Sequence, residues 1–159
     1  MSRRSYGILI TGLCLTLAAI AANAATSRSA QGTWKLNVAK SSYEQMQAPK
    51  FERLVVTTDK PDAIKWMLTG AGADGKSYVT TYDGPVDGKP RPYGNSAVGN
   101  TITYTRSQSG LEWVVKDKAE AVIEKGVGHV SEDGNTLTLK GTEGANGKAT
   151  FVSVFDRVQ

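Results

Sequence analysis

The chain has 159 residues and a formal net charge of +4, and 40% of its residues are hydrophobic while 21% are charged. This composition is too apolar for an intrinsically disordered chain, and the length fits one globular domain. Removing Arg3 and Arg4, which precede an apolar run, lowers the 19 basic residues to 17, against 15 acidic residues. The resulting net charge of +2 gives no electrostatic argument for binding nucleic acid.

Residues 1–24 have the pattern of an export signal. A basic start is followed by an uncharged apolar run over residues 7–22, and an Ala-Asn-Ala cleavage motif ends at Ala24. The run is short for an uncleaved membrane anchor, which is the alternative interpretation. We therefore expect a signal peptide at 1–24 and a single mature domain at 25–159 that has no membrane span and is periplasmic or secreted.

The single cysteine, Cys14, lies within the apolar run, where its neighbours do not fit a lipoprotein processing site. The expected mature domain therefore contains no cysteine, which excludes a disulfide, a thiolate nucleophile and a cysteine metal site. A domain of this length can be stable with an apolar core alone.

The mature chain consists of short runs in which apolar and polar residues alternate between turn residues. Ile64, Trp66 and Leu68, for example, recur at every second position, as does the set that begins at Leu111. This period of two is typical of β-strands with one buried face. We predict ten strands at approximately 32–37, 51–58, 63–69, 76–82, 90–94, 100–106, 111–116, 120–131, 136–141 and 149–158.

Turn residues between these runs predict the topology. Asp74-Gly75, Asp133-Gly134 and Asn146-Gly147 are pairs that tolerate the positive φ of tight hairpins. Consecutive strands are therefore expected to pair in antiparallel fashion, and closing the sheet removes its unpaired edges. The predicted fold class is all-β, an antiparallel up-and-down β-barrel of about ten strands. A transmembrane barrel is disfavoured because its strands need roughly 9–11 residues.

Two segments interrupt the alternation. Residues 83–99 contain Pro85, Pro90 and Pro92, so we expect an irregular loop with a weak or edge strand. Residues 38–50 are long enough for one or two helical turns, and we predict such turns at 42–47.

A phosphate-loop pattern occurs at Gly70–Ser77, which satisfies G-x-x-x-x-G-K-[ST]. A phosphate-binding loop requires a helix directly after it, because the phosphates bind N–H groups at the helix N-terminus. Residues 78–82 are Tyr-Val-Thr-Thr-Tyr, a sequence that favours a strand. We therefore assign the glycines to a hairpin turn and predict no nucleotide binding.

Residues suited to catalysis or metal binding are sparse. His129 is the sole histidine, and a general base would need an orienting carboxylate and a nucleophile beside it. A metal site at His129 would lack further histidine or cysteine ligands. The acidic pairs Asp83 with Asp87 and Glu132 with Asp133 are explained by turn formation. We predict no catalytic residue, no metal site, no cofactor and no enzymatic activity.

Several aromatic residues fall at expected inward positions of their strands, and Arg106 lies two residues beyond Tyr104 on the same side. Aromatic rings with a few polar groups inside a small barrel suit a mainly apolar ligand that has one polar end. Alternatively, the rings fill the barrel completely. The predicted ligand-binding residues are Trp66, Tyr82, Tyr104, Arg106 and Trp113.

The motif Gly32-Thr33-Trp34, together with Arg157 near the end of the chain, resembles the lipocalin-like (calycin) barrels. In those proteins a G-x-W motif opens the first strand and a basic residue of the last strand packs across the Trp. The resemblance implies structural roles for Trp34 and Arg157, with about 0.5–2 kcal/mol from the cation–π contact. Residues 32–43 are also similar to small exported bacterial proteins that are lipocalin-like. The length and the lack of a disulfide are closer to the ten-stranded fatty-acid-binding type.

The predicted function is therefore binding of a small, mainly apolar ligand inside a monomeric exported barrel. The alternative is a non-enzymatic interaction module that binds a protein or envelope polymer through the loops at 38–50 and 83–99. A ligand-sized cavity would favour the first function. A solid core and exposed loop aromatics such as Tyr93 would favour the second.

Overall fold

The computed structural model describes residues 28–93, 100–144 and 147–159. The predicted leader at 1–24, Cys14, residues 94–99 of the predicted loop and Asn146 lie outside the described residues. Within the described ranges, no helix is both long enough and apolar enough to span a membrane. The elements are β1 Gly32–Leu36, η1 Val38–Lys40 (a 3₁₀ turn), β2 Ser42–Glu44, β3 Phe51–Asp59, β4 Ala63–Ala71, β5 Ser77–Pro85, β6 Arg91–Pro92, β7 Thr101–Ser107, β8 Gly110–Lys116, β9 Val122–Val130, β10 Thr136–Glu143 and β11 Ala149–Arg157.

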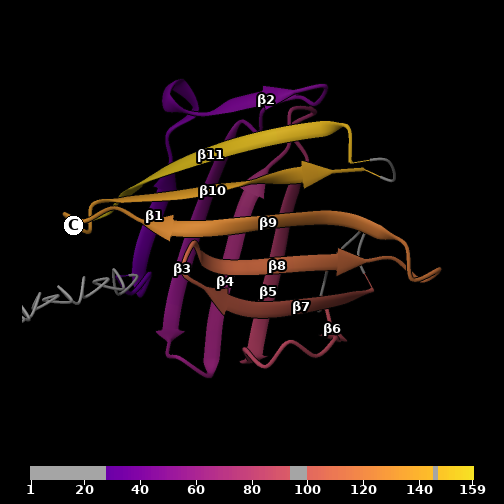
Figure 1. Ribbon diagram of the computed structural model, residues 1–159. Helices are drawn as coiled ribbons and strands as arrows, with labels where there is room; N and C mark the ends of the chain where they lie inside the picture. Colours follow the sequence, from indigo (N-terminus) through magenta and orange to yellow (C-terminus); the bar gives the residue numbers. More distant parts are fainter. Residues whose placement is uncertain (1–27, 94–99, 145–146) are drawn as a thin grey trace, which may run out of the picture.

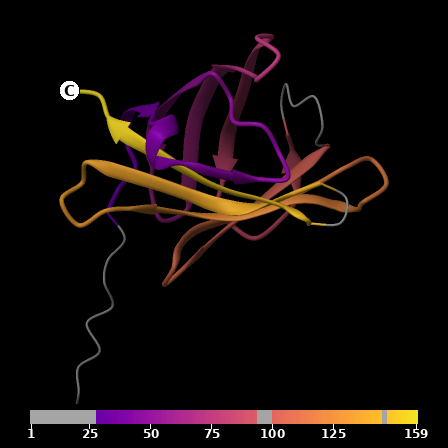
Figure 2. The same ribbon diagram turned by 90° about the horizontal axis from the view of Figure 1, so that it is seen from above.

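The eleven strands form one antiparallel sheet in the order β5-β4-β3-β1-β11-β10-β9-β8-β7-β6, with β2 paired to β11. Strand β1 pairs with β3 on one side and with β11 on the other, so it joins the first strands of the chain to the last. The sheet curls so that β3, β4 and β5 form one wall and β7 to β11 form the wall facing it (Figures 1 and 2). The predicted all-β antiparallel barrel is therefore confirmed, and it is nearly closed.

The sheet ends at β5 and β6, and a loop and two tyrosines bridge the opening between β5 and β7. The backbone N–H of Gly88 donates a hydrogen bond to the carbonyl of Tyr104 over 2.9 Å. The rings of Tyr82 and Tyr104 pack across the opening with their centres 4.8 Å apart. The chain therefore closes the barrel here with side chains and a loop, in place of a strand ladder.

The core lies between the two walls and is made of the inward residues that the alternation predicts. Trp34, Ile102, Val115 and Phe155 are the largest side chains with almost no exposure. Burial of such side chains contributes about 1.5–3 kcal/mol each relative to exposure. The weak strand expected near 90–94 is the two-residue β6 at the end of the sheet.

The prediction of helical turns at 42–47 is wrong. The helical turn lies earlier, at Val38–Lys40, and β2 is a strand that pairs with β11. Because β1 has five residues and pairs only with the last part of the nine-residue β11, it leaves an edge of β11 uncovered. β2 occupies this edge, and the hydroxyls of Tyr43 and Ser153 share a hydrogen bond of 2.9 Å. Strand pairing here overrides local preference.

Candidate functional site

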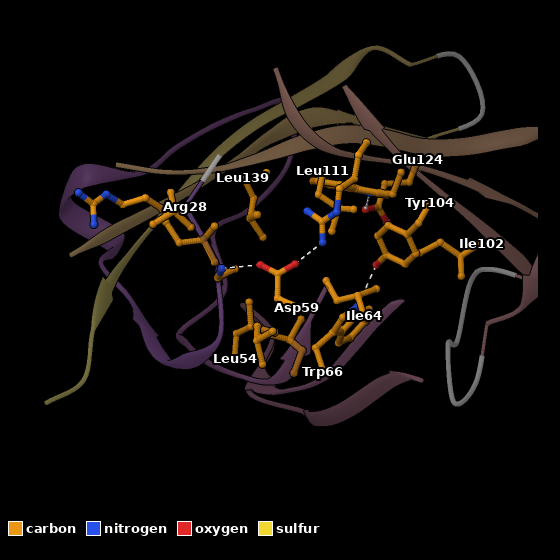
Figure 3. Close-up of a pocket in the computed structure, with 18 of the residues that line it drawn as sticks. Arg28, Leu54, Asp59, Ile64, Trp66, Ile102, Tyr104, Leu111, Glu124 and Leu139 are labelled. Carbon is orange, nitrogen blue, oxygen red and sulfur yellow. Dashed lines mark hydrogen bonds and ion pairs between the residues drawn. The ribbon is translucent and has the colours of Figure 1, made fainter. Parts of the chain in front are cut away.

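A cavity of about 150 Å³ lies inside the barrel between the two walls (Figure 3). An engineered cavity of about this size in another protein takes up benzene, whereas pockets for drug-sized ligands span roughly 300–1,000 Å³. The cavity therefore accepts a group of about one ring without side-chain movement. It is lined by Arg28, Ala30, Leu54, Val56, Asp59, Ile64, Trp66, Leu68, Tyr93, Ile102, Tyr104, Arg106, Leu111, Trp113, Glu124, Gly128, Val130, Leu137 and Leu139.

The structure places four of the predicted ligand-binding residues on this cavity, namely Trp66, Tyr104, Arg106 and Trp113. Trp66 on one wall donates a hydrogen bond of 3.0 Å from Nε1 to the hydroxyl of Tyr104 on the other. Tyr82 is buried but does not line the cavity, so the structure does not bring it together with the other four residues there. Its ring packs against Tyr104, and its hydroxyl donates to the carbonyl of Pro85 over 2.9 Å.

The indole of Trp113 lies on a part of the wall that has no side chain beneath it. Trp113 pairs in register with Gly126, and a Cβ at Gly126 would collide with the ring. The indole stacks with Phe151, with ring centres 6.4 Å apart and an angle of 27° between the planes. Its Nε1 donates a hydrogen bond of 2.7 Å to Oε1 of Glu124. Glycine on β9 thus lets a large ring lie flat and reach a carboxyl group.

Glu124 is a lining residue that our sequence reasoning missed. Burial raises its pKa from 4.5 to about 7, and the nearby carboxylates of Glu143 and Glu52 add to this rise while the Trp113 hydrogen bond opposes it. Glu143 is its register partner on β10. Its position in the strand could have revealed it. Glu124 lies two and four residues before Gly126 and Gly128, and side chains alternate along a strand, so Glu124 shares their inward face.

The end of the cavity away from Glu124 is lined by an ion pair between Asp59 and Arg106. Asp59 faces inward because β3 has a register shift between Val56 and Thr58, and such a bulge re-aims the residues that follow. Its carboxylate accepts hydrogen bonds from the N–H of Ala30, over 2.5 Å, and from Arg106. Arg106 also donates to the carbonyl of Lys60 over 2.7 Å. The Asp59 side chain is only 6% exposed, so this pair neutralises the Arg106 charge.

Trp34 and Arg157 lie at the same end as Asp59 and hold the N-terminal segment, residues 28–31. Trp34 donates from Nε1 to the carbonyl of Ala30 over 2.7 Å. Arg157 lies 4.1 Å from the centre of the Trp34 ring and donates from Nη1 to the carbonyl of Gln31 over 2.8 Å. The residues that carried the family resemblance therefore close one end of the barrel.

Tyr93, the loop aromatic expected to be exposed in an interaction module, is directed inward. Its ring meets Trp66 edge to face, with centres 6.3 Å apart, and it lines the cavity. Burial raises its pKa well above the ordinary tyrosine range. The side chain thus forms part of the internal site.

The remaining motifs have structural roles. The glycine-rich segment at Gly70–Ser77 spans the end of β4, the turn at 72–76 and the first residue of β5, so a strand follows the turn as predicted. Asp74 in this turn accepts a hydrogen bond from the N–H of Lys76 over 3.0 Å. His129 is exposed, on the position between the inward residues Gly128 and Val130. Among the residues described, no group of three histidine, cysteine or acidic side chains is placed to hold a metal ion.

No protein family model matches the sequence, and no curated protein matches it. Among solved structures, the wild type and a point mutant of the fluorescent protein UnaG are 14% identical to this chain, each with a TM-score of 0.54. The matches cover 80% and 81% of this chain and 96% of UnaG. A zebrafish ileal bile acid-binding protein complexed with cholic acid is 14% identical with a TM-score of 0.49, over 80% of this chain and 98% of that one. The likeness to UnaG shows the fold alone, a nearly closed antiparallel β-barrel.

Proposed function

We propose that this chain is an exported, monomeric protein that binds a small, mainly apolar molecule inside its barrel and performs no chemistry on it. The observation that carries this proposal is the internal cavity of about 150 Å³, which has apolar side chains on both walls. Removing apolar ligand surface from water in such a site contributes about 25 cal/mol per Å². A ligand larger than one ring would bind by displacing lining side chains.

The position of Tyr93 supports internal binding over the alternative of an interaction module. An interaction module would display its loop aromatics to a partner, whereas Tyr93 packs against Trp66. The charge balance of the expected mature chain also gives no reason to propose nucleic acid as a partner. A nearly closed sheet supports a monomer, because it leaves little strand edge for pairing with a second copy.

Export is supported by the leader pattern at residues 1–24. Expression of the full chain in a bacterial host tests it. We expect a product in the periplasm or medium whose N-terminus is Ala25, and recovery of only uncleaved chain in the cytoplasm would contradict export.

A non-catalytic role is supported by how the titratable groups are used. Asp59 is bound to Arg106 and Ala30, and His129 lies on the outer face. Glu124 has a raised pKa, which is frequent at functional sites, but general acid–base chemistry needs a second group poised beside the reacting atoms. We assign Glu124 to ligand recognition.

Native mass spectrometry and calorimetric titration with benzyl alcohol, a one-ring neutral probe, test cavity binding. We expect one molecule bound per chain, and loss of binding in Leu139→Trp, in which the new ring fills the cavity. The matched control is Val79→Trp, which adds the same ring at an exposed position on β5. Failure of the folded wild type to bind, or equal binding by both variants, would overturn the proposal.

A further inference from the structure

Of the two acidic residues that line the cavity, one has an ion-pair partner and the other has none among the described residues. The charged lining residues are Arg28, Asp59, Arg106 and Glu124. Asp59 and Arg106 form an ion pair, and Figure 3 shows the Arg28 guanidinium directed away from that pair and from Glu124. None of the ion pairs within the described residues includes Glu124. The carboxyl group of Glu124 is therefore the acidic group on the wall that no cation of the described residues balances.

Within the described part of the chain, the groups around Glu124 also lack a cation. Its register partners are Val115 on β8 and Glu143 on β10, and its described hydrogen bond comes from Trp113 over 2.7 Å. Glu52 on β3 is a further carboxylate whose charge acts on Glu124. The phenols of Tyr93 and Tyr104, which also feel the charge of Glu124, carry no positive charge in either protonation state. A negative ligand group would meet repulsion here, whereas a positive one would relieve it.

We propose that the ligand is a small amphiphilic amine, whose ammonium group donates a hydrogen bond to Glu124 while its apolar part, about one ring in size, fills the cavity. This inference rests on the proposed ligand binding and names the ligand class. A charge-assisted hydrogen bond in a partly buried site gives both affinity and orientation. The aromatic rings of Trp66 and Tyr104, which line the same cavity from its two walls, further favour a cation.

Amine binding is linked to the protonation of Glu124. The ammonium group binds the ionised carboxylate, and the pKa of about 7 means that the ionised fraction rises between pH 6 and pH 8. The affinity for an amine therefore rises over this interval. A ligand carboxylate has the opposite dependence, because it needs Glu124 protonated. The groups that face Glu124 and modulate this titration are Glu52, Glu143, Tyr93, Tyr104 and Trp113.

Calorimetric titration at pH 8 with three probes of one ring skeleton tests the inference: benzylamine, benzyl alcohol and benzoate. We expect benzylamine to bind on the order of tenfold more tightly than the alcohol, and benzoate to bind least. Glu124→Gln keeps the shape and an acceptor for Trp113 but removes the charge, and it should lose the amine preference while retaining alcohol binding. Glu132→Gln makes the same charge change at an exposed turn position and should retain the preference.

The outcomes separate the inference from the proposed function. If benzyl alcohol binds but benzylamine is not preferred, or if Glu124→Gln keeps the preference, the amine assignment is wrong and cavity binding stands. If no probe binds, both fail. A second readout is pH, since benzylamine affinity should fall from pH 8 to pH 6 in the wild type and stay level in Glu124→Gln. Equal falls in both proteins would overturn the role of Glu124.

Discussion

The guanidinium group of Arg157 lies 4.1 Å from the centre of the Trp34 ring, and this pair joins the last strand of the barrel to the first. Arg157 also donates from Nε to the carbonyl of Gly134 over 2.6 Å and from Nη1 to the carbonyl of Gln31. One side chain therefore ties together β1, β11, the turn before β10 and the N-terminal segment, residues 28–31. Arg157 therefore stabilises the same end of the barrel as Trp34, although the two residues lie at opposite ends of the described chain.

Replacing Arg157 with Ala should lower the free energy of unfolding by about 3 kcal/mol. The loss combines the cation–π contact with two charge-assisted hydrogen bonds, and it leaves two backbone carbonyls without a donor. Arg157→Lys should be intermediate, because an ammonium group keeps the charge but cannot reach both carbonyls in the same geometry. Urea denaturation followed by Trp fluorescence measures both. Lys140→Ala, at an exposed position of β10, should change stability by less than about 0.5 kcal/mol. Equal effects of Arg157→Ala and Lys140→Ala would contradict this role.

Features of the barrel that depend on local sequence were predictable. Alternation placed most strands within a few residues, and pairs such as Asp133-Gly134 marked the hairpins, since Gly134 adopts a φ of 76°. The inward direction of Trp66 and Tyr104 followed from the same period of two. Each of these predictions needs only neighbouring residues, because side-chain direction in a strand is fixed by position.

Features set by partners distant in the chain were not predictable from one sequence. Residues 42–44 became a strand because β11 offered an uncovered edge, not because of their own preference. Asp59 faces inward because of a bulge, which shifts the period of two by one residue. The alternation of side chains along β9 could have placed Glu124 on the inward face. That its charge is unbalanced could not be foreseen, because this depends on Asp59 neutralising Arg106, a contact between side chains 47 positions apart.

Replacing Gly126 with Ala should distort the site as well as the fold. A Cβ there would collide with the Trp113 ring and with the carbonyl of Lys140, so the indole must move from the wall. Overpacking of this kind costs about 1–3 kcal/mol. Urea denaturation and the near-ultraviolet circular dichroism of the indole measure the two effects. Gly72→Ala is the control, since a Cβ there would lie 3.1 Å from Oδ1 of Asp74 and would have no aromatic ring within 4 Å. An unchanged indole signal in Gly126→Ala would show that the ring does not rely on this space.

Replacing Asp59 with Asn should shift the ligand preference of the cavity toward anions. The amide can still accept a hydrogen bond from Ala30, but it no longer neutralises Arg106, whose guanidinium would then present its charge at the cavity wall. Breaking this largely buried pair should also destabilise the fold by about 2 kcal/mol. Calorimetry with benzoate and benzylamine should show benzoate gaining relative to wild type. Asp83→Asn, which removes the acid of the exposed pair with Lys65, should leave the preference unchanged. The same preference between benzoate and benzylamine in both variants would mean that Asp59 does not neutralise the charge of Arg106.

The raised pKa of Glu124 should make stability depend on pH in a direction that can be checked. An acid with a pKa of about 7 in the folded protein and an ordinary value of 4.5 when unfolded binds more protons in the folded state between these values. The contribution of Glu124 to the free energy of unfolding is therefore fully present below pH 4.5 and is lost as the pH rises through about 7. The full difference corresponds to at most about 3 kcal/mol, and partial exposure of the side chain reduces it.

Glu124→Gln removes this titration, so its unfolding free energy relative to wild type should rise by about 2 kcal/mol between pH 5 and pH 8. Urea denaturation of both proteins at several pH values measures the difference, and taking the difference removes most of the contribution of Glu52, whose pKa burial also raises. Glu132→Gln should follow the wild type throughout, because its side chain lies in an exposed turn. A difference that stays constant with pH would show that Glu124 titrates like a solvent-exposed glutamate, and the cavity would then carry an ordinary carboxylate at neutral pH.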